Sequence, residues 1–164
     1  KSQRRAVERG EKGKGDFMRA IRSIGFGFAL SFPLLSIAAS DNTVNTEKDL
    51  YEQCGAYSQA GMKDCLAKKA SESRVYLKKA EDDALAVIKK WDEDDKYIHA
   101  SEVALAASNK EFVKYRAAQC EFSASLSGGG AGNAHEMGRL ACVAELNSRR
   151  VEQLRNAVSD LPSK

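Results

Sequence analysis

Four cysteines, Cys54, Cys65, Cys120 and Cys142, constrain the fold of this chain more than any other feature of its sequence. An even number of cysteines in a small exported domain indicates two disulfides, because the compartments beyond the inner membrane are oxidising. Four cysteines permit three pairings, and the chain order offers two short loops, Cys54 with Cys65 and Cys120 with Cys142. Each such bridge is expected to stabilise the fold by about 3 kcal/mol. The alternative, a four-thiolate metal site, favours close CxxC pairs, which the sequence lacks.

The beginning of the chain has the composition of an export signal preceded by a polar segment. Residues 1–17 are polar and basic and show no apolar periodicity, so we interpret them as a disordered or untranslated upstream segment. Met18 then opens a short basic region that contains two arginines. This order, a basic region followed by an apolar one, is typical of a secretory signal peptide, which we predict over residues 18–40.

The apolar run over residues 24–37 distinguishes a signal peptide from a membrane anchor. It has about 14 residues, fewer than the roughly 20 needed to cross a hydrocarbon core. Ala38 and Ser40 place small side chains at the two positions that a signal peptidase inspects. We therefore expect cleavage before Asp41, no membrane span in the remaining domain over 41–164, and a periplasmic or secreted protein.

Removal of the predicted signal changes the charge of the protein. Residues 1–40 hold eight of the 26 lysines and arginines but three of the 23 acidic residues. The remaining 18 basic and 20 acidic residues give a net charge near −2. A nucleic-acid partner is not expected, because such proteins neutralise phosphates with an excess of basic side chains.

Helical periodicity dominates the remaining sequence. Thr46 and Ser58 are candidate N-caps, and Gly55 can end the short helix between them. Apolar or small residues then recur at three- and four-residue steps, which marks one face of a long helix. They are Met62, Leu66, Ala70, Ser73, Leu77, Ala80, Ala84, Val87, Ile88 and Trp91.

Two further helices complete the predicted fold. We place a loop over residues 92–96 and a third helix from about Ser101 through Phe122, with Leu105, Phe112 and Tyr115 along it. The four glycines within 123–133 indicate a loop, and a last helix runs from about Ala134 to a point before Pro162. No window alternates as a half-buried strand does, so we predict an all-α fold, a small bundle of three to four helices with two disulfides.

The sequence contains no complete catalytic, metal or cofactor motif. His135 and Glu136 begin a zinc-protease HExxH, but Arg139 occupies the place of the second histidine. The glycines from Gly128 complete no phosphate-binding motif, and no predicted strand precedes them. With the cysteines oxidised, no thiolate is available as a nucleophile. We therefore expect a binding protein without catalytic residues, metal or cofactor.

The second half of the chain resembles the LprI-type lysozyme-inhibitor family. The matching elements are Phe112-Val-Lys-Tyr115-Arg116, Cys120-Glu-Phe122, Ser127-Gly-Gly-Gly, and Cys142 followed by Arg150 and Leu154. Cys54 and Met62-Lys-Asp-Cys65 are similar to the family's opening element, so the resemblance covers about residues 50–158. The family usually has Trp, Gln and Thr where this chain has Phe112, Asn109 and Asn147.

The resemblance implies a periplasmic or secreted helical protein that binds a lysozyme or another cell-wall hydrolase. An immunity or envelope-stress protein with a different toxin or peptidoglycan enzyme as its partner is the alternative, and a structural envelope component is a third. Tyr115 and Arg116 of the family motif could contact a partner. We favour a structural role, with Tyr115 in the core and Arg116 paired with a carboxylate or at a helix end.

The glycine-rich segment from Ser127 to His135 is the predicted partner-binding loop. A Cys120–Cys142 bridge would hold it on both sides, so that less conformational entropy is lost on binding. Its candidate contact residues are Ser127, Gly128, Gly129, Gly130, Asn133 and His135. A plain connector between two helices is the competing interpretation.

Overall fold

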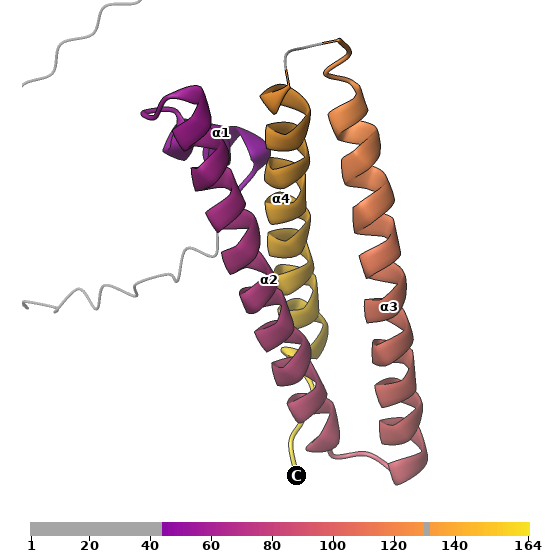
Figure 1. The fold of residues 1–164 in the computed structure, drawn as a ribbon. Helices are drawn as coiled ribbons and strands as arrows, with labels where there is room; N and C mark the ends of the chain where they lie inside the picture. The colour runs from indigo at the N-terminus through magenta and orange to yellow at the C-terminus, as the bar shows by residue number, and fades with distance from the viewer. Residues whose placement is uncertain (1–43, 130–131) are drawn as a thin grey trace, which may run out of the picture. The chain divides into compact units, whose positions relative to one another are not determined.

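The computed structural model describes residues 44–129 and 132–164, so the predicted signal peptide and the segment before it lie outside the described residues. Four helices follow one another along the chain (Figure 1). They are α1 (Glu47–Cys54), α2 (Gln59–Lys89), α3 (Asp95–Ser125) and α4 (Asn133–Val158). The prediction of an all-α bundle is confirmed.

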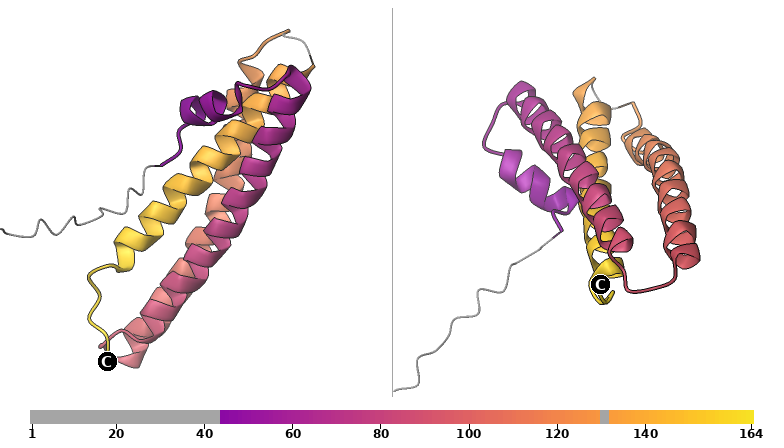
Figure 2. Two further views of the ribbon diagram at one scale, coloured as in Figure 1. Left: turned by 90° about the vertical axis from the view of Figure 1, so that its left-hand side faces the viewer. Right: turned by 90° about the horizontal axis from the view of Figure 1, so that it is seen from below.

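The three long helices form the bundle, and α4 packs against both α2 and α3 (Figures 1 and 2). The chain runs down α2, back up α3 and down α4, so that α2 and α4 are parallel. Helix α1 is short and packs against α2 and α4. No helix among the described residues is long and apolar enough to cross a membrane.

The predicted caps of the first two helices are confirmed. Thr46 caps α1 in a capping box, in which its Oγ1 accepts from the Asp49 N–H at 3.2 Å while Asp49 Oδ2 accepts from the Thr46 N–H at 2.9 Å. Gly55 follows the last residue of α1. Ser58 Oγ accepts from the Gly61 N–H at the start of α2. Each of these two N-caps joins residues only three positions apart, which is why the sequence alone could predict it.

The predicted start of the third helix is wrong by six residues. Helix α3 begins at Asp95, with Asp94 as its N-cap residue, so the residues expected to form a loop include the first two residues of the helix. Carboxylates next to a helix N-terminus interact favourably with its partial positive charge, which explains why acidic residues open this helix. The helix also continues to Ser125, so the connection to α4 spans only residues 126–132.

The core is divided into two clusters along the bundle. The first surrounds both disulfides and includes Leu50, Leu66 and Leu140. The second lies farther along α2 and α4 and includes Leu77, Val151 and Leu154, with Phe112 packed against it. Both clusters are built mainly from α2 and α4, and only Cys120 and Ala124 of α3 are buried.

Both predicted disulfides are present. Cys54–Cys65 joins the end of α1 to the first turns of α2, and Cys120–Cys142 joins α3 to α4. The Cα atoms of the two pairs are 5.7 and 5.5 Å apart. Each bridge therefore fixes a junction between consecutive helices.

The last residues of the chain close the opposite end of the bundle. The Asp92 N–H donates to the Pro162 carbonyl at 2.9 Å, and the Lys164 N–H donates to the Lys90 carbonyl at 2.9 Å. The C-terminal segment is thereby held against the connection between α2 and α3 (Figure 2).

Candidate functional site

Two arginines of the sequence motif enclose an aromatic ring where α3 meets α4. The guanidinium carbons of Arg116 and Arg150 each lie 5.6 Å from the centre of the Phe112 ring. Such cation–π contacts are worth about 0.5–1 kcal/mol at exposed sites and more where water is excluded. Arg150 Nη2 also donates to Ser108 Oγ at 2.7 Å and to Asn109 Oδ1 at 3.1 Å.

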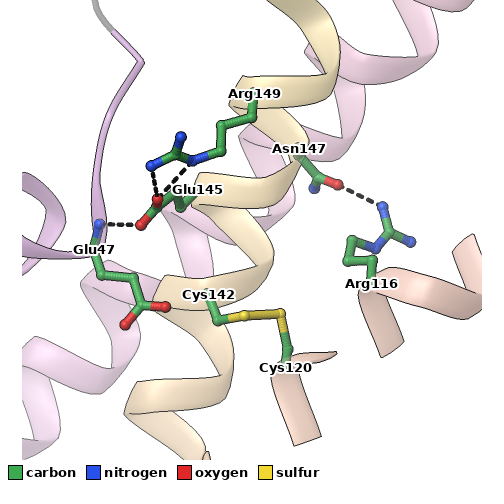
Figure 3. Close-up of a disulfide and its surroundings, with 7 residues drawn as sticks. All are labelled: Glu47, Arg116, Cys120, Cys142, Glu145, Asn147 and Arg149. Atoms are coloured by element: carbon green, nitrogen blue, oxygen red, sulfur yellow. Dashed lines mark hydrogen bonds and ion pairs between the residues drawn. A yellow bond between two sulfur atoms is a disulfide. The ribbon is translucent and has the colours of Figure 1, made fainter. Parts of the chain in front are cut away.

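Asn147 connects this cluster to α2. Its side chain is fully buried, and its Oδ1 accepts from Arg116 Nη1 at 2.5 Å (Figure 3). Its Nδ2 donates to Ser73 Oγ at 2.8 Å. The Ser73 hydroxyl donates to the Ala70 carbonyl, so it can only accept from the amide. Because arginine can only donate, the orientation of the amide is fixed from both sides.

The electrostatics of the cluster follow from its partial burial. Burial lowers the pKa of Arg116, and the nearby Arg74 lowers it further, while Glu81 opposes the shift. Burial likewise raises the pKa of Glu81. Within the described part of the chain, the Nε of Arg150 is buried without a hydrogen-bond partner. These charges lie between packed helices.

The motif residues therefore divide into packing residues and one exposed residue. Leu154 is buried in the second core cluster, Phe112 packs against that cluster, and Arg116 and Arg150 hold α3 to α4 by hydrogen bonds. The prediction that Tyr115 packs in the core is wrong, because its side chain is 54% exposed. Arg116 donates to an amide rather than pairing with a carboxylate.

The predicted loop lies at one end of the bundle, just beyond the Cys120–Cys142 bridge (Figure 1). A side chain built at Gly128, Gly129 or Gly132 would meet no atom within 4 Å beyond the neighbouring residues, so each of these three glycines has open space beside it. Gly128 has a φ of 59°, which favours glycine. Gly130 lies outside the described residues.

Part of the predicted loop belongs to helix α4. Asn133 and His135 belong to the first turn of α4, and His135 Nε2 lies 3.4 Å from Glu121 Oε1 on α3. One turn farther on, Arg139 forms two hydrogen bonds with Glu136, at 2.7 and 2.8 Å. Polar side chains of α3 and α4 thus lie close to the points where the loop joins these two helices.

Sequence reasoning missed two exposed apolar residues next to this loop. Phe122 and Leu126, four residues apart on α3 and its C-cap, are 60% and 72% exposed. The sequence placed Phe122 in the third helix but did not assign it to an exposed face. Apolar residues occur all around α3, so periodicity did not identify which face the neighbouring helices would cover.

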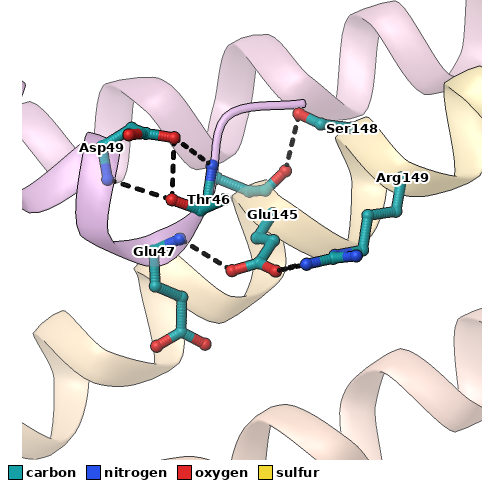
Figure 4. A network of polar contacts seen from close by, with 7 residues as sticks. Thr46, Glu47, Asp49, Glu145, Ser148 and Arg149 are labelled. Carbon is teal, nitrogen blue, oxygen red and sulfur yellow. Dashed lines mark hydrogen bonds and ion pairs between the residues drawn. The ribbon is translucent and has the colours of Figure 1, made fainter. Parts of the chain in front are cut away.

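A polar network near the Cys120–Cys142 bridge connects helix α1 to α4. Glu145 Oε2 accepts from the Glu47 N–H at 2.7 Å, and Glu145 Oε1 accepts from Arg149 Nε at 2.7 Å (Figure 4). Thr46 and Asp49 complete the network through the capping box. The end of the bundle that carries the loop is thereby restrained on the α1 side too.

The described residues contain no group of three or more histidine, cysteine or acidic side chains that could hold a metal ion. All four cysteines are oxidised. The side chain of His99 is 80% exposed, and its Nδ1 lies 3.8 Å from Glu102 Oε2. His99 is near the start of α3, whereas His135 is in the first turn of α4, beside the end of α3. The two histidines of the chain are therefore not brought together.

The fold and its two bridges define a small disulfide-linked helical domain with a projecting loop at one end. The family model described as Lysozyme inhibitor LprI matches residues 52–154, a range that contains both bridges and the loop. The chain belongs to this family, as the sequence motif predicted. The comparisons with curated proteins and with solved structures find no match.

Proposed function

We propose that this protein acts outside the cytoplasm and inhibits a lysozyme or a related cell-wall hydrolase by filling the substrate cleft of that enzyme. Membership in the LprI lysozyme-inhibitor family is the observation that carries the proposal. Two disulfides support an oxidising compartment. The predicted signal peptide over residues 18–40 would supply the route of export.

The loop over residues 126–132 is the part of the domain best suited to enter a cleft. Its described glycines have open space around them, and a disulfide holds the two helices that carry it. A restrained loop loses less conformational entropy when it binds.

The chemistry of a lysozyme cleft suggests how the loop would bind. Such a cleft is lined by two carboxyl groups that act on the glycosidic bond. Ser127, Asn133 and His135 offer a hydroxyl, an amide and an imidazole around the loop. Donors of these kinds can hydrogen-bond carboxylates, and a backbone rich in glycine can approach them closely.

The test is a titration of lysozymes of several structural types with the oxidised protein, with lysis of bacterial cell walls as the readout. We expect stoichiometric inhibition of one type. We expect its loss when a neutral linker replaces residues 127–133, with Gly128 kept because of its positive φ. Undiminished inhibition by that variant would exclude the loop, and no inhibition of any type by the folded protein would exclude this function.

The two histidines provide a matched pair of point variants. His135→Ala is expected to weaken inhibition by about tenfold, the usual effect of a well-placed contact residue. His99→Ala removes the same side chain from an exposed position near the start of α3, at the other end of that helix from the loop, and should leave inhibition unchanged. Equal effects of the two substitutions would contradict the placement of the interface at the loop.

A further inference from the structure

Helix α2 forms the floor of a long groove on the side of the bundle that carries α1. The groove consists of three hollows of about 590, 240 and 260 Å³, in order along the helix. Lys69 and Glu72 line both the first and the second hollow. Ser73 and Tyr76 line both the second and the third, so the hollows follow one another. From Gly61 to Tyr76 the floor is roughly 22 Å long, at 1.5 Å per residue.

The opposite wall of the groove comes from α1, which packs beside α2 (Figure 2), and from α4. Asn45, just before α1, and Gln53, on α1, line it together, and Gln53 Nε2 donates to Asn45 Oδ1 at 3.1 Å. Ser148 and Glu152 line it along α4. Hydrogen-bond donors and acceptors from three helices therefore border one cleft. Clefts of several hundred Å³ between the helices of a bundle are typical ligand sites.

Two exposed tyrosines lie along the groove. Tyr57, which precedes α2, is 58% exposed and lines the first hollow, and Tyr76 is 61% exposed and lines the other two. Gly61 leaves room for Tyr57 on the helix, because a side chain built at Gly61 would lie 3.0 Å from Tyr57 Cβ. Each tyrosine offers a ligand an apolar ring face and a polar hydroxyl group.

The charges that line the groove are balanced. Among the described residues they are three cations and three anions, namely Lys68, Lys69, Arg155, Asp64, Glu72 and Glu152. Charges of both signs also lie close together, since Lys68 Nζ is 3.9 Å from Glu72 Oε1. A ligand with a strong net charge of either sign would face like charges along the groove. The lining therefore complements a ligand that is polar and uncharged.

We propose that this groove binds an uncharged oligosaccharide in an extended conformation. One face of a sugar ring carries C–H groups, which stack on aromatic rings such as those of Tyr57 and Tyr76. Each sugar hydroxyl group can both donate and accept a hydrogen bond, so it can use the amide of Gln53 as well as the carboxylate and ammonium groups of the groove. The length of the groove gives room for several consecutive sugar rings.

An extended peptide fits this groove less well than a sugar chain does. Extended peptides are commonly bound through main-chain hydrogen bonds to the edge of a sheet, whereas helices line this groove and pair their own backbone groups internally. The groove shares no described lining residue with the loop over residues 126–132. Binding of an oligosaccharide is therefore a second binding function, and it does not depend on the proposed inhibition.

NMR titration of the isotope-labelled, oxidised protein with chitohexaose and with cellohexaose tests the proposal. Both probes are uncharged, straight-chain hexasaccharides. We expect the amide signals of residues 57–76 and 148–152 to shift with at least one of them, and those of the loop to stay in place. Tyr57→Ala and Tyr76→Ala should each raise the dissociation constant about tenfold, as the loss of an aromatic contact residue does. The same spectra show whether each variant is folded.

Tyr97→Ala is the matched control, because Tyr97 is 50% exposed in the first turn of α3, a helix that supplies none of the described lining residues. It should leave the dissociation constant unchanged, and an equal loss in this variant would overturn the proposal. The absence of any shift with either hexasaccharide up to about 5 mM, which reveals even weak binding, would also overturn it. If an uncharged hexapeptide shifts the same signals and neither hexasaccharide does, the groove is a peptide site and the proposal is wrong.

Discussion

Asn147 is the single residue on which three helices converge. It lies on α4, donates to Ser73 of α2 and accepts from Arg116 of α3, and it has no exposed surface. A buried amide is tolerated because both of its ends are paired. Asn109, Phe112 and Asn147 all contact Arg116 or Arg150. These five residues therefore form one packing cluster.

Asn147→Ala is expected to lower the free energy of unfolding by about 2–4 kcal/mol, because it leaves Arg116 without its partner and creates a small cavity. Urea unfolding of the oxidised protein measures this change. Asn156→Ala, an exposed position on the same helix, should alter stability by less than about 0.5 kcal/mol. Similar losses for the two variants would show that the buried amide contributes nothing specific.

Glu47 is a single residue that makes the stability of the protein depend on pH. Burial raises the pKa of its carboxyl group, and the neighbouring Glu145 raises it further. A raised pKa means that the folded state favours the protonated form, so the stability contributed at low pH is lost as the pH rises through the folded pKa.

Glu47→Gln should therefore stabilise the protein at pH 7, and the gain should vanish near pH 3. The expected gain is on the order of a few tenths of a kcal/mol, because the carboxyl group is partly exposed. Thermal unfolding at the two pH values measures it. Glu52→Gln, on the exposed face of the same helix, removes an ion pair with Lys48 and should give no gain at pH 7.

At the scale of elements, the two disulfides have similar structural roles but different relations to the proposed loop. Cys54–Cys65 closes a separation of 11 residues and Cys120–Cys142 one of 22. The entropy of loop closure depends only weakly on length. The stabilisation from the two bridges should therefore be alike, while only the second borders the loop.

Replacing either pair with alanines should lower the free energy of unfolding by about 3 kcal/mol. Removing Cys120–Cys142 should also weaken inhibition by a folded protein, because the loop ends are released, whereas removing Cys54–Cys65 should not. Denaturant unfolding and the cell-wall assay measure the two effects. Equal inhibition by the two variants, each tested below its unfolding temperature, would contradict a role for the bridge in presenting the loop.

At the scale of the whole domain, α4 organises the described residues. It supplies most of the buried residues of the first core cluster, shares the second with α2, and contacts α2, α3 and α1. The loop lies at one end of the bundle, and the C-terminal segment closes the other.

The sequence by itself determined the features that depend on neighbouring residues. The caps at Thr46 and Ser58, most of the buried face of α2 and the two short disulfide loops were predicted correctly, because each is specified within a few turns of helix. Only the tertiary structure decided the orientation of α3. Apolar residues lie on all sides of α3, so the local pattern could not show which side faces the other helices. The packing of α3 against α4 leaves Tyr115 and Phe122 exposed and places Arg116 within hydrogen-bond distance of Asn147. Contacts between residues far apart in sequence depend on that packing, which no local pattern encodes.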